Sequence, residues 1–272
     1  LRMHLGKRYV FPHNDIESCE KQLQRATKLA EETGGGMLLT TEGVFGMIKA
    51  QGKLKEIVEL KKKFDFRLLV DDAHGFGTMG KTGAGTGEEQ GVQDQIDLYF
   101  STFAKSMASI GAFIAADADV ILFLRYNMRS QIFAKSLPML LVEGALKRLD
   151  MLRSQPELKD NLWKIVYALR KGLVENGFST GKSNSPVTPV VLNGTVGEAA
   201  ALSMDLRENF GIFCSVVIYP VIPKGMIILR LIPTAVHTLD DVNITVKAFA
   251  AVKDKLTSGV YKNSAIALSF GE

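Results

Sequence analysis

The stretch Arg67-Leu-Leu-Val-Asp-Asp-Ala-His-Gly75 decides how this chain is interpreted, because an apolar run ends in two carboxylates and a histidine. A short apolar run of this kind predicts a buried β-strand. A carboxylate at the end of such a strand is costly to bury unless a partner offsets its charge. Strand alternation places Asp71 and Asp72 on opposite sides, and we assign Asp72 no catalytic role. The stretch therefore predicts a strand that leads into a polar site at Asp71 and His74.

A second strand-like run ends in Ser101-Thr-Phe-Ala-Lys105, which adds two hydroxyls and a lysine. An acid, a histidine, a hydroxyl and a lysine at neighbouring strand ends are the groups that pyridoxal phosphate (PLP) requires. The acid pairs with the pyridinium nitrogen, the lysine forms a Schiff base, and the hydroxyl reaches the phosphate. Taken singly, each residue has a simpler explanation, such as a loop-fixing aspartate or a hydrogen-bonding histidine. Their order along the chain favours a PLP site.

Apolar strands alternate with amphipathic helices through the first half of the chain, which predicts βαβ units and a mostly parallel sheet. The expected strands are 37–41, 67–70, 94–103 and 112–116, and the expected helices are 17–32 and 53–64. A mostly helical region follows to residue 152, broken near Pro138. The expected elements of the second half are a helix over 156–175, a strand over 187–192, a helix over 196–209, strands over 212–219 and 226–232, and a helix from residue 239. We therefore predict a large α/β domain over 1–155 and a smaller α+β domain over 156–272.

Composition argues against several other classes of protein. The 272 residues carry 33 basic and 29 acidic side chains, a net charge of +4, without a dense basic tract, so nucleic acid is not an expected partner. Cys19 and Cys214 show neither a disulfide pattern nor zinc-ligand spacing, and we expect no metal site and a cytoplasmic protein. The longest apolar stretches contain charges and are too short to span a membrane.

The segment Gly75-Phe-Gly-Thr-Met-Gly-Lys-Thr82 fits two nucleotide-binding patterns, GxxxxGK[ST] and GxGxxG. Both patterns need a helix to begin at once, because the helix N-terminus binds the phosphate. Gly83, Gly85 and Gly87 follow instead, and each glycine costs about 1 kcal/mol in a helix interior. We therefore interpret the segment as a glycine-rich loop beside a site.

Four segments together resemble the α-oxoamine synthase family of fold-type I PLP enzymes, which have the aspartate aminotransferase-like fold. They are 70–80, 101–106, 129–138 (Arg-Ser-Gln-Ile-Phe-Ala-Lys-Ser-Leu-Pro) and 229–238 (Leu-Arg-Leu-Ile-Pro-Thr-Ala-Val-His-Thr). Within the family the chain is most similar to the bacterial serine palmitoyltransferases. The resemblance implies that Asp71 binds the pyridinium nitrogen, His74 contacts the cofactor's 3-hydroxyl, Thr102 binds the phosphate and Lys105 carries the cofactor. It also implies that Arg230 holds the carboxylate of the amino acid, a role that suits a guanidinium fork.

The chain also departs from the family pattern. The family's large domain begins well before residue 1, so we expect that the chain is the C-terminal part of a longer enzyme. Where the family continues Ser-Met-Asp-Gly-Asp, this chain reads Gly46-Met-Ile-Lys-Ala50. Ala134 stands where a neighbouring subunit often supplies a hydroxyl, with Lys135 or Ser136 as possible substitutes.

The resemblance implies an enzyme of sphingolipid biosynthesis that condenses L-serine with a long-chain acyl-CoA. The products are a 3-keto long-chain base, CO2 and CoA. The rival interpretations within the family are glycine C-acetyltransferase or another α-oxoamine synthase. A rival of another class is a catalytically silent fragment or partner subunit. We expect a homodimer, and we expect that residues 1–272 alone are inactive.

Overall fold

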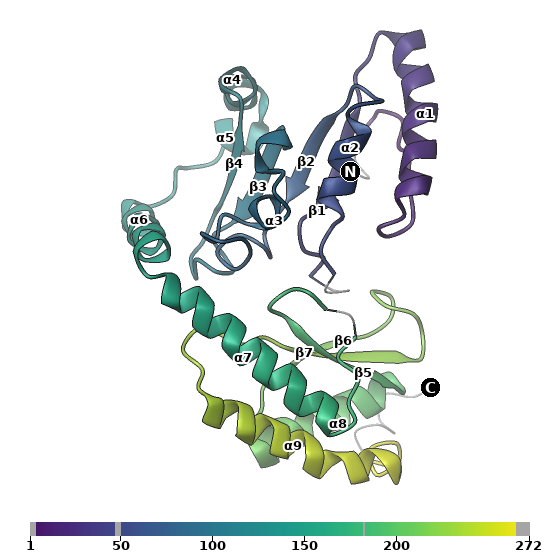
Figure 1. Cartoon of the computed structure of the whole chain (residues 1–272), viewed down its shortest axis with the longest axis vertical. Helices are drawn as coiled ribbons and strands as arrows, with labels where there is room; N and C mark the ends of the chain where they lie inside the picture. Colours follow the sequence, from purple (N-terminus) through teal and green to yellow (C-terminus); the bar gives the residue numbers. More distant parts are fainter. Residues whose placement is uncertain (1–3, 47–49, 182, 265–272) are drawn as a thin grey trace. The chain divides into compact units, whose positions relative to one another are not determined.

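The computed structural model describes residues 4–46, 50–181 and 183–264. The chain separates into two compact units. Unit 1 comprises Leu1–Val44 and Gln51–Arg153, and unit 2 comprises Phe45–Ala50 and Ser154–Glu272. Each unit has its own sheet and its own core, and Figure 1 shows the elements of both.

Unit 1 is built on a four-stranded sheet in the order β1-β2-β3-β4. The strands are β1 (Leu38–Glu42), β2 (Arg67–Asp71), β3 (Leu98–Thr102) and β4 (Ala112–Ala116). The first three are parallel, with Thr41 beside Val70 and Val70 beside Tyr99. Because parallel strands point the same way, their carboxyl ends share one edge of the sheet.

Strand β4 runs antiparallel to β3, which the sequence analysis did not predict. A parallel connection needs a crossover of a dozen or more residues. Only residues 103–111 separate the two strands, so the chain turns back as a hairpin. This short connection is the segment that carries Lys105.

Two amphipathic helices cover the sheet of unit 1, α1 (Ile16–Thr33) and α2 (Leu54–Leu60). The Asp15 carboxylate caps α1 by accepting a hydrogen bond from the Ser18 N–H at 2.9 Å, and Gly34 ends the helix in the left-handed conformation. The apolar faces of both helices meet the strands in one core, which includes Cys19, Leu23, Leu54, Ile57, Leu68 and Val70. Two short pieces, α3 (Thr86–Glu89) and a 3-10 turn (Gln93–Gln95), precede β3.

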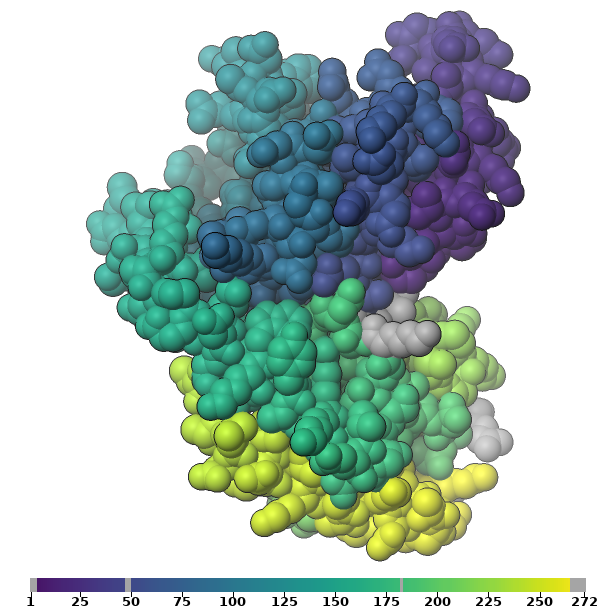
Figure 2. All heavy atoms as spheres, in the orientation of Figure 1, coloured from purple at the N-terminus to yellow at the C-terminus, as the bar shows by residue number. Residues whose placement is uncertain are grey.

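Three further helices follow β4: α4 (Ala118–Asn127), α5 (Arg129–Ile132) and α6 (Met139–Ser154). None of their residues is buried. The segment 118–154 exposes large apolar side chains, among them Leu122, Phe123, Tyr126, Phe133, Met139 and Leu140. Figure 2 shows this teal segment at the molecular surface. Exposed apolar side chains that gather into a large patch normally mark an interaction site.

Among its described residues, unit 2 has a three-stranded antiparallel sheet and three helices. The strands lie in the order β5-β7-β6 and are β5 (Thr188–Asn193), β6 (Ser215–Val217) and β7 (Met226–Leu231). The helices are α7 (Pro156–Glu175), α8 (Val196–Phe210) and α9 (Leu239–Thr257). Thr195 and Thr238 form capping boxes at the starts of α8 and α9.

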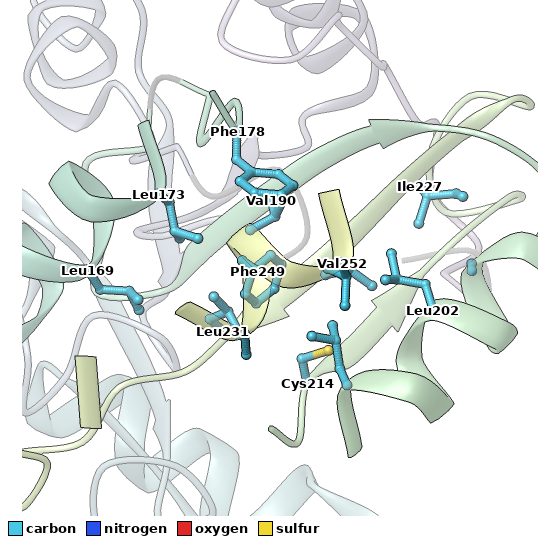
Figure 3. Packing of buried hydrophobic residues seen from close by; sticks show 14 of the residues in the cluster. Leu169, Leu173, Phe178, Val190, Leu202, Cys214, Ile227, Leu231, Phe249 and Val252 are labelled. Carbon is cyan, nitrogen blue, oxygen red and sulfur yellow. The ribbon is translucent and has the colours of Figure 1, made fainter. Parts of the chain in front are cut away.

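The core of unit 2 lies between its sheet and its helices (Figure 3). Phe249 of α9 is fully buried and meets Phe178 edge-on, with ring centroids 5.4 Å apart. Leu169, Leu173, Val190, Leu202, Leu229 and Val252 surround these rings. In the part of the chain that the structure describes, no helix is long and apolar enough to cross a lipid bilayer.

Candidate functional site

The candidate site of unit 1 lies at the carboxyl edge of its parallel strands. Asp71 is the last residue of β2, and it is paired with Phe100 of β3, so β3 extends two residues further to Thr102. The segments that leave these strands carry His74 and Lys105. The topology thus brings all the predicted cofactor-contacting residues of the large domain to one edge, where α/β sheets commonly bind their ligands.

The Asp71 carboxylate is partly buried at the end of β2. Its Oδ1 accepts a hydrogen bond from the Ala73 N–H at 3.1 Å. Within the described residues, no hydrogen bond reaches its Oδ2. A half-buried carboxylate oxygen with spare accepting capacity fits the protonated ring nitrogen of PLP, which supplies both a donor and a positive charge.

His74 follows in a turn that starts directly after β2. The Asp72 carbonyl accepts hydrogen bonds from the Gly75 N–H and the Phe76 N–H, both at 2.9 Å, and these bonds close the turn around the histidine. The His74 carbonyl accepts a further bond from the Thr78 hydroxyl at 3.0 Å. The backbone of His74 is therefore held on both sides, which sets the direction of its half-buried ring.

The two hydroxyls before the lysine lie in different environments. Ser101 is fully buried, and its hydroxyl lies 3.4 Å from the Asp72 carbonyl. The Thr102 hydroxyl donates to the Gly111 carbonyl at 3.0 Å and accepts from the Ala104 N–H at 3.1 Å. Thr102 thus shapes the start of the Lys105 turn, and a contact with phosphate requires its hydroxyl to exchange the Gly111 carbonyl for a phosphate oxygen.

Lys105 is exposed on a tight turn whose backbone is well bonded. The Ala108 N–H donates to the Lys105 carbonyl at 2.9 Å, and the Ser109 N–H donates to the Phe103 carbonyl at 2.8 Å. Beside this turn the ring of Phe113 contacts Phe103 and Phe76, at centroid distances of 5.5 and 5.2 Å. These aromatic contacts tie the lysine turn to the glycine-rich loop after His74.

The glycine-rich loop contacts the lysine turn directly. A Cβ built on Gly77 would lie 2.5 Å from the Ser106 Oγ, so only glycine fits there. Residues 73–83 form turns and bends, and α3 begins only at Thr86. The segment therefore lacks the immediate helix of a nucleotide-binding loop, in agreement with our interpretation from the sequence.

Arg230 belongs to unit 2, where it lies in the central strand β7 between Pro189 of β5 and Ser215 of β6. The side chain is half-buried, and this burial lowers the pKa of its guanidinium. A poorly hydrated guanidinium favours an anionic partner such as a carboxylate.

Residues 47–49, which belong to the segment 46–50 that departs from the family pattern, lie outside the described residues.

Sequence reasoning missed the environment of Asp72. Its fully buried carboxylate accepts hydrogen bonds from both the N–H and the hydroxyl of Thr86, at 2.6 and 2.7 Å. The Tyr99 hydroxyl lies 3.0 Å from the same carboxylate. Burial raises the pKa of Asp72. The feature of the sequence that could have indicated this environment is the pair Gly75 and Gly85, which flank the carboxylate at positions where a side chain would not fit.

Within the described ranges, no group of three or more potential ligand side chains could hold a metal ion.

Residues 1–249 match the family described as aminotransferase class I and II. The chain is 63% identical over 262 residues to a cysteate-C-fatty acyltransferase of Capnocytophaga ochracea, covering 96% of this chain and 62% of the relative. It is 34% identical over 251 residues to the serine palmitoyltransferase of Sphingobacterium spiritivorum, covering 92% of this chain and 61% of the relative. The chain thus spans less than two thirds of the length of these relatives.

Solved structures agree with the sequence matches. The serine palmitoyltransferase of Sphingomonas wittichii superposes with a TM-score of 0.83 at 31% identity, covering 90% of this chain and 60% of that one. A structure of SPT that holds PLP gives the same TM-score at 30% identity and the same coverage of both chains. These findings confirm the predicted fold-type I architecture, the resemblance to the α-oxoamine synthases and PLP as the cofactor.

Proposed function

The chain belongs to the aminotransferase class I and II family, and from its similarity to acyltransferases within that family we propose that it forms part of a PLP-dependent C-acyltransferase. The enzyme joins a fatty acyl group to the α-carbon of an amino acid. A bond forms between that carbon and the thioester carbonyl carbon of acyl-CoA, and the C–S bond breaks. The amino acid loses its carboxylate as CO2, and the CoA thiolate takes up a proton.

L-Cysteate is the amino acid that we propose, in place of the L-serine expected from the sequence. The observation that carries this proposal is the 63% identity to a protein named cysteate-C-fatty acyltransferase, against 34% for a serine palmitoyltransferase. The two substrates share the α-amino and carboxylate groups and differ in the side chain, a sulfonate against a hydroxyl. With cysteate the product is a 2-amino-3-keto sulfonate with a long alkyl chain. Serine remains the second candidate because the superposed structures are serine palmitoyltransferases.

In this proposal, Asp71, His74 and Lys105 each have a distinct role at the cofactor. Bound PLP supplies an electron sink that stabilises negative charge at the α-carbon. Asp71 keeps a proton on the ring nitrogen, and His74 contacts the ring's 3-hydroxyl. Lys105 holds the cofactor between turnovers and then moves the proton at the α-carbon.

The remaining predicted residues bind the anionic groups of cofactor and substrate. Thr102, with Ser101 behind it, binds the phosphate in our proposal. The Arg230 guanidinium holds the substrate carboxylate through two parallel hydrogen bonds until that group leaves as CO2.

A homodimer is the proposed assembly. The support is the apolar surface of α4, α5 and α6, in which no residue is buried. A second copy would remove the side chains of Phe123, Phe133 and Leu140 from water, which is worth about 25 cal/mol per Å² of apolar area. The cytoplasm remains the proposed compartment, supported by two buried free cysteines, Cys19 and Cys214.

The decisive experiment measures CoA release from palmitoyl-CoA by the full-length protein with L-cysteate, L-serine or glycine as the second substrate. We expect the highest kcat/KM with L-cysteate. A higher value with L-serine would replace cysteate by serine and leave the acyltransferase proposal standing. Absence of turnover with every amino acid would favour the silent partner subunit. Lys105→Ala serves as the inactive control.

A further inference from the structure

Asp72 is the one fully buried carboxylate among the described residues, and the proposed chemistry does not use it. It lies between Asp71 and the His74 turn. Its carboxylate accepts hydrogen bonds from Thr86 at Oδ1 and Oδ2 and has the Tyr99 hydroxyl within 3.0 Å. Burying such a group is costly, so its retention beside the site calls for a physical explanation.

Both ends of the glycine-rich loop are attached to this one residue. At the start of the loop, the Asp72 carbonyl accepts the Gly75 N–H at 2.9 Å. At the end of the loop, the Asp72 carboxylate accepts the Thr86 N–H at 2.6 Å. The main-chain N–H of Asp72 donates to Phe100 of β3 at 2.8 Å. Asp72 therefore links the loop to two strands of the sheet.

The surrounding glycines leave room for the Asp72 carboxylate. A Cβ built on Gly43, Gly75 or Gly85 would lie 2.0 to 2.1 Å from one of its oxygens. Three chain segments thus approach the same carboxylate at distances that no other residue type permits. Gly85 also has a φ of +118°, a conformation that strongly favours glycine.

We propose that Asp72 is a positioning residue, whose buried carboxylate closes the loop 75–85 through Thr86 and thereby holds Asp71 and His74 in place for the cofactor. The loop in turn supports the lysine turn, because Gly77 of the loop is in contact with Ser106. The Tyr99 hydroxyl, which also lies 3.0 Å from the Ala84 carbonyl, secures the second end of the loop. This inference rests on the proposed binding of PLP at Asp71, His74 and Lys105.

The test compares Thr86→Val with Thr86→Ser in the full-length protein. Valine keeps the size of the side chain and removes its hydrogen bond to Asp72, whereas serine keeps the hydroxyl. The matched control is Thr82→Val, because the exposed Thr82 in the same loop donates to the Glu88 carboxylate at 3.0 Å. The measurements are the dissociation constant of PLP, the visible circular dichroism of the bound cofactor and the melting temperature of the apoprotein.

We expect Thr86→Val to raise the PLP dissociation constant about tenfold and to change the circular dichroism, as for the loss of one hydrogen bond to a buried carboxylate. Thr86→Ser and Thr82→Val should match the wild type in both. A lower melting temperature for Thr86→Val with unchanged PLP binding and spectrum would overturn the inference, because Asp72 would then only stabilise the fold.

A second variant decides the question if Thr86→Val does not fold. Tyr99→Phe keeps the ring beside Phe113, 6.1 Å between centroids, and removes the hydroxyl from Asp72. It should also weaken PLP binding, and unchanged binding would count against the inference. A wild-type protein that does not bind PLP would overturn the proposed function itself, an outcome separate from a wild-type protein that binds PLP and variants that bind it equally well.

Discussion

Asp71 and Asp72 are adjacent in the chain, yet the fold gives them opposite environments. Asp71 is half-buried at a strand end and accepts a backbone hydrogen bond from the Ala73 N–H at 3.1 Å. Asp72 is fully buried among Thr86, Tyr99 and three glycines. The difference follows from the alternation of side chains along a strand. One carboxylate can therefore face a ligand while the other organises the protein around it.

Lys105 is predicted to carry the cofactor. Reduction of the PLP-loaded full-length protein with borohydride, followed by peptide mapping, should place the phosphopyridoxyl group on Lys105. The physical reason is its place on the turn that leaves β3, beside the loop that carries His74. Lys105→Ala should abolish the label. A label on Lys81 or Lys135 in the wild type would show that the assignment is wrong.

Arg230 is predicted to bind the carboxylate of the amino acid. Arg230→Ala should raise the KM for the amino acid by about 10- to 150-fold, the equivalent of losing about 1.5 to 3 kcal/mol from a charge-assisted hydrogen bond. The absorption spectrum of the bound cofactor should not change. Arg207→Ala on the exposed face of α8 serves as the control and should leave the KM unaltered. An unchanged KM for Arg230→Ala would leave this arginine with a structural role only.

Asp72 should make stability depend on pH in a defined direction. Burial raises the pKa of Asp72, so the folded state holds this proton more tightly than the unfolded state does. Its contribution to stability is present below the ordinary aspartate pKa and is lost as the pH rises through the raised value. Asp72→Asn cannot ionise and avoids this loss. In thermal unfolding of the apoprotein, the melting temperature of the variant relative to wild type should increase from pH 4 to pH 7, and a difference that is constant with pH would contradict the prediction.

At the scale of elements, the hydrophobic periodicity predicts the helices and strands that form the units. The expected helix 17–32 is observed as Ile16–Thr33, and the expected strand 226–232 as Met226–Leu231. The direction of β4 was not predicted, although the short segment 104–111 between the expected strands 94–103 and 112–116 leaves no room for a parallel crossover. The hydrogen bonds from Thr86 and Tyr99 to Asp72 could not be predicted from the sequence, because they join residues that are 14 and 27 positions apart.

The glycine-rich loop offers a prediction at the same scale. Gly85→Ala should lower the free energy of unfolding by about 1 to 3 kcal/mol from backbone strain alone, because the φ of +118° is unfavourable for alanine. The loss should be larger still, because the new Cβ would lie 2.1 Å from the Asp72 carboxylate. Gly91→Ala is the matched control, with a φ of +69° and no atom within 4 Å of the added Cβ. It should cost only about 1 to 2 kcal/mol from the left-handed backbone. Chemical denaturation of both variants tests the difference, and equal losses would mean that the loop relaxes around the new methyl group.

At the scale of the whole molecule, the sheet of unit 1 has two unpaired edges in the part of the chain that the structure describes. Among the described residues, β1 and β4 are each paired on one edge only. Unpaired strand edges and the apolar surface of α4 to α6 favour association with other chains. The relative from Capnocytophaga ochracea is longer, since the matched part is 62% of its length. The sheet edges and the exposed apolar side chains of unit 1 are thus surfaces against which further protein could pack.

We therefore predict that residues 1–272 expressed alone bind PLP weakly and show no acyltransferase turnover, whereas the full-length protein binds PLP and catalyses turnover. In our proposal, unit 1 offers the cofactor the Asp71 carboxylate, Lys105 and only part of a phosphate site, because the Thr102 hydroxyl already donates to the Gly111 carbonyl. Spectral titration with PLP and CoA release from palmitoyl-CoA, with L-cysteate and L-serine, should be measured on both proteins. Size-exclusion chromatography with light scattering will show whether the shorter protein aggregates. Turnover by residues 1–272 at the full-length rate would show that the open sheet edges and the exposed apolar helices have no bearing on the site.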